Sequence, residues 1–286
     1  MTKIGFIGCG TVGTALAVRL SARGYKVVAA ASRTRASAER LASMVGGCRV
    51  CDKPDEVAGL SEVVFVTTPD DAIPGIVAQT KWRAGQAVLH CSGADSVDTL
   101  QPARSAGAQV GGFHPLQTFA SIAQAVENIP GSTFALEAEE PLLSTLKQMA
   151  GDLGGRSVVL GPGDKVLYHA AAVMASNYFV TLVKLATDLW QKFGVSTPEA
   201  TRALIPLLRG TVNNIENVGL PHCLTGPVAR GDLGTVKKHL EALEKAAPEV
   251  LPSYRHLALQ TIPVALGKGR INQEKAEELR RLLGGD

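Results

Sequence analysis

A glycine pattern near the start of the chain constrains the fold most strongly. Three glycines follow a short apolar run, Ile4 to Ile7, and open a helical stretch, Val12 to Ala22. The first glycine permits a tight turn, the second lets a ligand approach the backbone, and the third lets the helix pack closely on the strand. The helix N-terminus then attracts an anion. The pattern predicts a strand, turn and helix that hold the pyrophosphate of a dinucleotide through Gly8, Cys9, Gly10, Thr11, Val12 and Gly13.

The first half of the chain alternates short β-branched runs with helical stretches. The expected strands are Ile4 to Ile7, Val27 to Ala31, Val63 to Thr67, Ala87 to His90, Val110 to Phe113, Thr133 to Leu136 and Ser157 to Leu160, with a short third strand near Cys48 and Cys51. A second helix, Ala36 to Val45, is expected before Gly46 and Gly47. This alternation predicts an α/β fold with a doubly wound parallel sheet of the Rossmann type.

The strand signal ends at Gly161-Pro162-Gly163. Five long helical patterns follow, at Lys165 to Phe193, Pro198 to Glu216, Leu233 to Ala247, Leu251 to Leu266 and Gln273 to Leu283. A chain of 286 residues is also longer than one compact core normally organises. We therefore expect a Rossmann domain over residues 1–163 and an all-helical domain over residues 164–286, in which Ala170 to Leu189 forms a buried helix.

Composition excludes several classes of protein. The 29 basic and 26 acidic residues are spread along the chain without a basic tract, which disfavours a nucleic-acid partner. Five scattered cysteines do not describe a disulfide framework and indicate a reducing, cytoplasmic location. The apolar run Ile4 to Ile7 is short and is followed by glycines, so we expect it to be neither a signal peptide nor a membrane span. Cys48 and Cys51 lack the further ligands of a metal site, so we expect no metal.

The end of the second expected strand indicates which dinucleotide binds. A site for NAD carries an acidic residue there, which binds the ribose 2′-hydroxyl. This chain has Ser32, Arg33 and Thr34 instead, followed by Arg35. One or two cations and two hydroxyls suit the 2′-phosphate of NADP. The alternative is that the arginines are solvated loop charges.

Other strand ends point into the same crevice, because ligands of such sheets gather outside the carboxyl ends of the strands. Thr67, Thr68 and Pro69 follow one strand, and Ser92 and Gly93 follow the next. We expect them to contact the cofactor, although the same residues also build ordinary turns. Cys91 lacks an identifiable activating base, so it is expected to be buried rather than nucleophilic.

Four longer sequence motifs lie further along the chain. They are H-C-S-G-A (90–94), F-H-P-L-Q-T-F (113–119), Y-H-A-A-A-V-M-A-S-N-Y (168–178) and L-T-G-P-V-A-R-G-D (224–232). The chain resembles a bacterial family that pairs a Rossmann-like domain with a helical domain of unknown function. That family is related to the 6-phosphogluconate and β-hydroxyacid dehydrogenases, ketopantoate reductase, pyrroline-carboxylate reductase and prephenate dehydrogenase. The resemblance implies NADP, hydride transfer and a homodimer formed through helical domains similar to the C-terminal domain of 6-phosphogluconate dehydrogenase.

Candidate catalytic groups share one face of the first long helix. At about 100° per residue, Lys165, His169 and Ser176 fall in one stripe, and Asn177 lies beside it. Lys165 could deliver a proton, His169 could relay it, and Ser176 or Asn177 could orient a substrate. In the related dehydrogenases an asparagine follows the lysine by one turn, whereas this chain has His169. The alternative is a solvated lysine and a structural histidine.

Weaker candidates complete the set. His114 could face the stripe across a cleft, or could be a turn residue before Pro115. Two polar pairs could bind a substrate carboxylate or could form ion pairs: Arg209 with Asn213, and Arg230 with Asp232.

Together these features predict an NADP-dependent oxidoreductase. It would transfer a hydride between NADPH and a small carbonyl or imine compound, such as a 2-oxo acid, in the cleft between the two domains. Two alternatives remain open: an NADP-binding sensor without catalysis, and a prephenate-dehydrogenase-like oxidative decarboxylation suggested by Gly112 to Pro115. The sequence does not specify the substrate.

Overall fold

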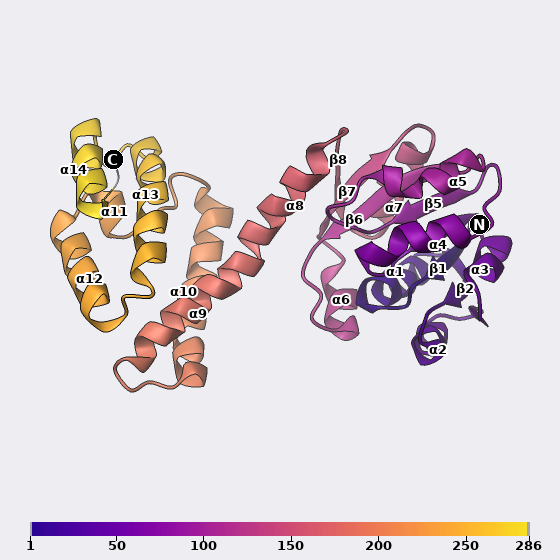
Figure 1. Cartoon of the computed structure of the whole chain (residues 1–286), viewed down its shortest axis with the longest axis horizontal. Helices are drawn as coiled ribbons and strands as arrows, with labels where there is room; N and C mark the ends of the chain where they lie inside the picture. The colour runs from indigo at the N-terminus through magenta and orange to yellow at the C-terminus, as the bar shows by residue number, and fades with distance from the viewer. Residues whose placement is uncertain (1, 285–286) are drawn as a thin grey trace. The chain divides into compact units, whose positions relative to one another are not determined.

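The computed structural model describes residues 2–284, and the chain forms two compact units, residues 1–176 and 177–286 (Figure 1). The division lies later in the chain than the boundary expected after residue 163. The helix that follows Gly163 belongs to the first unit, since side chains from its first turns contact the sheet.

The N-terminal unit is built on one eight-stranded sheet in the order β3-β2-β1-β4-β5-β6-β7-β8. The strands are β1 (Lys3–Ile7), β2 (Lys26–Ala31), β3 (Arg49–Cys51), β4 (Val63–Val66), β5 (Ala87–His90), β6 (Gln109–Leu116), β7 (Thr133–Ala138) and β8 (Arg156–Val159). Strands β1 to β6 are parallel, as in a Rossmann fold. The predicted fold class is confirmed in this part.

The expectation of a fully parallel sheet is wrong at β7. Strands β6 and β7 are antiparallel, with Leu116 opposite Thr133, and β8 runs parallel to β7. The chain therefore enters β7 at the same end of the sheet at which it leaves β6. The connection between Leu116 and Thr133 contains one short helix, α6 (Ile122–Asn128).

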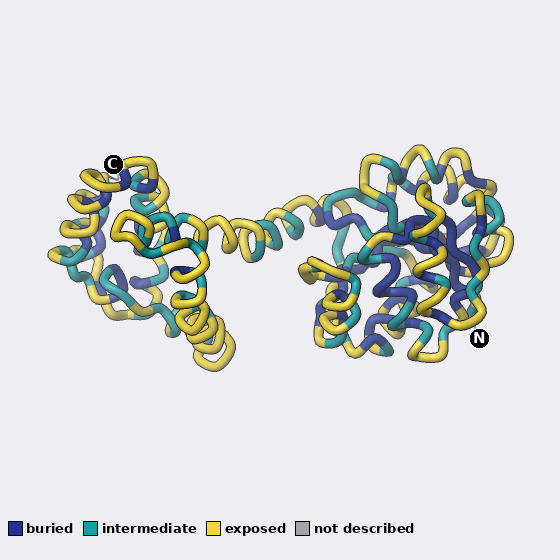
Figure 2. The backbone as a smooth tube through the Cα atoms, turned by 90° about the horizontal axis from the view of Figure 1, so that it is seen from below, coloured by how far each residue is buried: buried dark blue, intermediate teal, exposed yellow. Residues whose placement is uncertain are grey.

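Helices cover both faces of the sheet. They are α1 (Thr11–Ala22), α2 (Arg35–Met44), α3 (Pro54–Leu60), α4 (Ile73–Gln79), α5 (Gln101–Ser105), α6 and α7 (Leu142–Asp152). Helix α8 (Asp164–Ala175) contacts the sheet only through side chains of its first turns (Figure 1). A row of phenylalanines, Phe6, Phe65, Phe113 and Phe134, crosses one face with ring centroids 5.2, 5.8 and 4.7 Å apart. All four are fully buried, and each such burial contributes roughly 1.5–3 kcal/mol. Figure 2 shows the buried residues, in dark blue, at the centre of this unit.

The C-terminal unit is entirely helical, as predicted. It contains α9 (Asn177–Gln191), α10 (Thr197–Val218), α11 (Pro227–Arg230), α12 (Leu233–Ala246), α13 (Leu251–Gly267) and α14 (Gln273–Leu283). A capping box between Ser196 and Glu199 begins α10, and the Asp232 side chain caps α12. The core joins Val236, Ile262 and Leu279 from three different helices.

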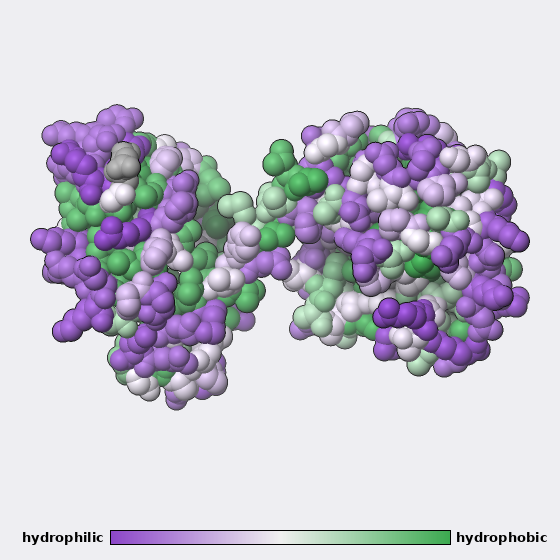
Figure 3. All heavy atoms as spheres, in the orientation of Figure 1, coloured by the Kyte–Doolittle hydropathy of each residue, from purple (hydrophilic) through white to green (hydrophobic). Residues whose placement is uncertain are grey.

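The long apolar helix expected from Lys165 to Phe193 is interrupted at Ser176, which separates α8 from α9. The expectation that Ala170 to Leu189 is buried is also wrong. Large apolar side chains of α8, α9 and α10 are exposed, among them Val166, Leu167, Met174, Val180 and Leu207, each at 65% or more. Green atoms on the helices in Figure 3 show apolar residues at the surface. By length and hydropathy alone, Asp164–Gln191 would also pass as a membrane span, which for a single helix is weak evidence.

Candidate functional site

The first glycine turn has the geometry that its sequence requires. Gly8 has φ +99°, and a side chain there would lie 2.6 Å from the Thr67 backbone. A side chain at Gly13 would lie 2.6 Å from the Gly8 carbonyl oxygen and overlap Thr67, whose hydroxyl donates to that oxygen at 2.6 Å. Gly10 has open space where a side chain would be. The turn is thus tightly packed on its inner side and open on its outer side.

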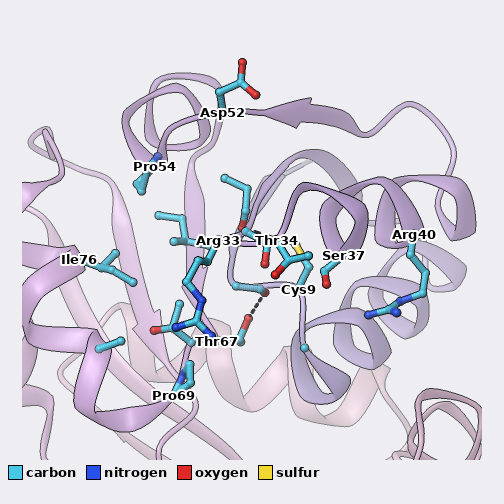
Figure 4. A pocket seen from close by; sticks show the side chains of 17 residues that line it. Cys9, Arg33, Thr34, Ser37, Arg40, Asp52, Pro54, Thr67, Pro69 and Ile76 are labelled. Atoms are coloured by element: carbon cyan, nitrogen blue, oxygen red, sulfur yellow. Dashed lines mark hydrogen bonds between the residues drawn. The ribbon is translucent and has the colours of Figure 1, made fainter.

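A cavity of about 580 Å³ opens at this turn (Figure 4). Nine of the predicted cofactor residues line it: Gly8, Cys9, Gly10, Ser32, Arg33, Thr34, Thr67, Thr68 and Pro69. Thr11, Val12 and Gly13 lie in helix α1, outside the lining, and Ser92 and Gly93 also lie elsewhere. The carboxyl ends of β1, β2 and β4 therefore converge on one pocket.

Two arginines face this pocket, and one of them differs from the expected pair. Arg33 extends from the end of β2, and Arg40 comes from α2 together with Ser37 (Figure 4). The expected second cation, Arg35, is instead paired with Glu39 and Asp52. Ser37 and Arg40 are three residues apart and share a helix face, which is the signal that could have identified them.

The Ser92 hydroxyl makes its hydrogen bonds to residues of the loops after β4 and β5. It donates to Asp70 Oδ2 at 2.8 Å and accepts from the backbone N–H groups of Ala94 and Asp95 at 3.3 and 2.9 Å. The loop after β5 is thereby tied to the loop after β4. These bonds favour the turn-building alternative for Ser92, and its contact with a cofactor stays a prediction.

A buried lysine occupies the carboxyl side of the sheet. Lys165, in the first turn of α8, lies over three residues that are in register across neighbouring strands: His90 of β5, Gly112 of β6 and Glu137 of β7. A side chain at Gly112 would lie 2.8 Å from Lys165 Nζ, so the glycine makes room for the ammonium group. Glu137 Oε2 is 3.5 Å from Nζ, and the two side chains are only 13% and 5% exposed.

The environment of Lys165 favours release of its proton. Burial lowers the pKa of Lys165, and the nearby Glu137 carboxylate opposes that shift. Its Nζ atom has no hydrogen-bond partner among residues 2–284. Burial and the lysine charge also lower the pKa of His90 to about 3, so this fully buried imidazole is neutral and accepts from Ser92 N–H at its Nδ1 atom.

Two further histidines adjoin the lysine. His114 Nδ1 is 2.8 Å from the Tyr168 hydroxyl, and its ring centroid is 6.2 Å from that of His169. A side chain at Gly93 would overlap His169 and lie 2.9 Å from His114 Nε2. The structure thus brings together Lys165, His169 and His114, as the sequence suggested. His114 lies within β6 rather than at its end, because the strand continues to Leu116.

Ser176 and Asn177 do not join this cluster. They share the helical stripe, but Ser176 lies eleven residues beyond Lys165, about 16 Å along the axis. It ends α8 with φ −116° and ψ −68°, and Asn177 opens α9 in the other unit. Lys165 and Ser176 therefore lie on one face of the helix but not at one site. Their roles toward a substrate stay predictions.

The remaining candidates have ordinary surroundings. Arg209 and Asn213 are exposed on α10, and Arg230 lies 4.0 Å from Asp232. Burial raises the pKa of the Cys9 and Cys91 thiols to about 12, which disfavours the reactive thiolate. Within residues 2–284, no cluster of His, Cys, Asp or Glu side chains is arranged to hold a metal.

Sequence reasoning missed Glu137, His90 and Tyr168 as parts of the site. Tyr168 and His90 stand in motifs that carried the family resemblance, but without a role. Nothing in the sequence around Glu137 marked it as a site residue. Its position depends on the antiparallel pairing of β7, which places it opposite Gly112.

Two family models match the chain, in line with this architecture. Residues 1–115 match a Rossmann-like domain, and residues 132–261 match a domain of unknown function, DUF2520. The chain thus combines the two domains that its motifs resembled, and the resemblance is confirmed. No curated protein matches it.

Solved structures extend the likeness over nearly the whole chain. A protein of Bacteroides fragilis described as a "putative NADP oxidoreductase" is 25% identical, with a TM-score of 0.72, over 92% of this chain and 98% of its own. Protein TM1727 of Thermotoga maritima is 25% identical, with a TM-score of 0.65, over 98% of each chain. The reductive aminase of Aspergillus terreus, in complex with NADPH and ethyl levulinate, is 18% identical, with a TM-score of 0.67, over 99% of each chain. At that identity, the last likeness shows the fold alone.

Proposed function

We propose that this protein is an NADP(H)-dependent oxidoreductase that reduces a small carbonyl or imine compound. One observation carries the proposal. The unit that holds the dinucleotide pocket also holds Lys165, a buried ammonium group whose partner is the Glu137 carboxylate at 3.5 Å. Such a group is available to donate a proton to a reacting heteroatom.

The pocket residues fit NADP(H). The open side of Gly10 and the N-terminus of α1 suit a pyrophosphate, and Arg33 and Arg40 suit a 2′-phosphate. No acidic side chain follows β2 directly, where NAD would require one. The complexes of the A. terreus enzyme with NADPH, on the same fold, support this choice.

When bound, the cofactor supplies a hydride for the carbon atom of the C=O or C=N bond. The heteroatom then needs a proton, which the Lys165 ammonium group donates, leaving a neutral amine that solvent reprotonates. Burial favours the neutral amine and so makes the Lys165 ammonium group a stronger acid than an exposed lysine. The products are an alcohol or an amine and the oxidised cofactor.

Turnover by the purified protein tests this proposal. NADPH oxidation is followed with a panel of 2-oxo acids, aldehydes, ketones and preformed cyclic imines, in wild type and in Lys165→Met. The substitution keeps the aliphatic bulk and removes the proton, so we expect kcat to fall by roughly 100-fold or more while NADPH affinity is kept. Lys184→Met, at an exposed lysine of α9, is the matched control.

Three outcomes would count against the proposal. If Lys165→Met turned over a substrate at the wild-type rate, Lys165 would not be the proton donor. Tight NADPH binding without turnover of any panel member would favour a cofactor sensor. Activity confined to NADP⁺ with a prephenate-like acid would favour oxidative decarboxylation.

We further propose that the protein is a cytoplasmic homodimer. Exposed large apolar side chains are concentrated on α8, α9 and α10, whereas those of a monomer in water are normally scattered singly. A second copy of the chain offers an equally apolar surface, and symmetric pairing would bury both. The same apolar character explains why Asp164–Gln191 passes as a membrane span on hydropathy alone.

A further inference from the structure

The contact between His114 and Tyr168 defines a direction for the imidazole. The two rings meet edge to face, with centroids 5.6 Å apart, and Tyr168 Oη lies 2.8 Å from His114 Nδ1. Among residues 2–284, this is the hydrogen bond that engages the His114 ring. The other ring nitrogen, Nε2, lies beside Gly93 on the side of His169.

Electrostatics fixes the charge of both partners. Burial, Lys165 and His169 lower the pKa of His114 to about 4, which makes the imidazole neutral near pH 7. Burial raises the pKa of Tyr168 to about 12, which keeps its phenol protonated. A neutral imidazole has one N–H donor and one acceptor, and its partner decides which nitrogen carries the proton.

A phenol is a better donor than acceptor, because its oxygen lone pair is delocalised into the ring. Tyr168 therefore donates to Nδ1, and the proton of His114 resides on Nε2. The imidazole then presents a neutral N–H donor on the side of Gly93, close to the ammonium group of Lys165.

We propose that Tyr168 is a positioning residue that holds His114 as the Nε2–H tautomer, so that His114 donates a hydrogen bond to the substrate heteroatom that Lys165 protonates. This inference rests on the proposed function for its substrate and adds a division of labour. Lys165 supplies the proton, His114 orients the accepting atom, and Tyr168 keeps His114 from presenting a lone pair there. An acceptor in that position would repel the substrate heteroatom.

The helical unit provides a matched control pair. His239 Nδ1 is 2.8 Å from the Tyr254 hydroxyl, with ring centroids 5.9 Å apart and nearly perpendicular rings. The geometry copies that of His114 and Tyr168, but the pair lies in the other unit. Tyr254→Phe thus removes a comparable hydroxyl without touching the site.

The decisive experiment is ¹⁵N NMR of histidine side chains in the protein without cofactor. The chemical shifts of the two ring nitrogens distinguish a protonated from an unprotonated nitrogen. In wild type we expect His114 to show unprotonated Nδ1 and protonated Nε2. In Tyr168→Phe we expect a mixture of tautomers, and in Tyr254→Phe an unchanged His114. Protonated Nδ1 in wild type, or an unchanged tautomer in Tyr168→Phe, would overturn the inference.

Kinetics separates positioning from packing. Tyr168→Phe is expected to lower kcat about tenfold, in proportion to one lost hydrogen bond, with unchanged NADPH affinity. His114→Gln places an amide N–H near the position of Nε2 and should retain more activity than His114→Asn, whose amide mimics Nδ1. In the His114→Gln background, Tyr168→Phe should have little further effect. Equal loss in His114→Gln and His114→Asn, or fully additive losses, would contradict the proposed role.

The two proposals fail separately. If the protein turns over none of the panel compounds but the tautomer follows the prediction, the proposed function is wrong and the pairing of Tyr168 with His114 remains. If turnover depends on Lys165 but the tautomer is unaffected by Tyr168→Phe, only this inference is wrong.

Discussion

Glu137 Oε2 and Lys165 Nζ lie 3.5 Å apart, and both side chains adjoin the space that Gly112 leaves free. The carboxylate opposes the fall in the lysine pKa that burial causes. It is the largest influence that keeps the ammonium form available, and Cys91 and Asp95 contribute less. The pH range of the reaction should therefore depend on Glu137.

Removing the Glu137 carboxylate should narrow the pH range over which the reaction proceeds. In Glu137→Gln the lysine pKa falls further, because burial acts without its counter-charge. The proton donor is present below its pKa and lost above it, so the alkaline limb of kcat should move to lower pH than in wild type, where it already lies below the ordinary lysine value of 10.5. Full pH profiles of Glu137→Gln and of the exposed control Glu139→Gln measure this. A limb that moves to higher pH would contradict it.

Gly93 should be intolerant of a single methyl group. A side chain there overlaps His169 and crowds His114, so Gly93→Ala must displace one imidazole. We expect kcat to fall by about tenfold or more, with NADPH affinity kept, because the cofactor pocket is lined by other residues. Gly75→Ala on α4 meets no atom within 4 Å and serves as the control. Normal kcat in Gly93→Ala would show that the imidazoles need not be so close.

The preference for NADPH over NADH should depend on two arginines. Arg33→Ala and Arg40→Ala each remove a charged donor to the 2′-phosphate, which is worth about tenfold in affinity, and the double variant about 100-fold. NADH affinity should change little. Arg35→Ala is the control, because Arg35 pairs with Glu39 and Asp52. Equal affinity of the wild type for NADPH and NADH, measured by titration, would refute the 2′-phosphate assignment.

His90 should make the protein sensitive to acid. Its pKa is about 3 when folded and 6.5 ordinarily, so the unfolded chain binds a proton over that interval and the folded chain does not. The free energy of unfolding should fall as the pH drops below 6.5, by about 2 kcal/mol at pH 5 from this group. Urea titrations at pH 7.5 and 5 should show a smaller pH dependence in His90→Asn, whose amide can still accept from Ser92 N–H. The exposed His222→Asn should behave as wild type. His114, whose pKa is also lowered, to about 4, leaves part of the pH dependence in His90→Asn, so an undiminished pH dependence in that variant would exclude His90 as an origin.

The apolar surface of α8 to α10 should determine the oligomeric state. Leu167→Asp and Val180→Asp place charges among exposed apolar side chains, at 77% and 68% exposure, and should raise the dimer dissociation constant by at least tenfold. Sedimentation velocity over a concentration series measures this. Leu257→Asp, at another exposed leucine on α13, is the control. A monomeric wild type would contradict the proposed dimer.

Local sequence was sufficient for most elements of the fold. The apolar run before Gly8 and the alternation that follows identified the parallel strands, and the helices after Gly163 lie within a few residues of their expected limits. The reversal of β7 was missed, because the apolar pattern of a strand does not record its direction. Helices as short as α4 and α5 connect parallel strands here, so the length of α6 gave no warning either.

The site was predictable where one element carries it. Gly8, Gly10 and Gly13 form a single turn, and Lys165 and His169 lie one helical turn apart. Glu137 and Arg40 reach their sites through pairing and packing that bring distant segments together. Ser176 lies apart from Lys165 for the opposite reason, since a helical stripe records the angle around an axis but not the distance along it, and its role toward a substrate stays a prediction.

The absence of a side chain at Gly112 limits which substitutions the sequence can accept during evolution. The ammonium group of Lys165 takes up the space that any other residue at 112 would fill, so the two positions form a pair although 53 positions separate them (165 − 112). A lineage that acquires a side chain at 112 must first lose the lysine or move it, and one that loses the lysine is free to fill the gap. Among homologues, glycine at 112 should accompany lysine at 165, and the two should disappear together.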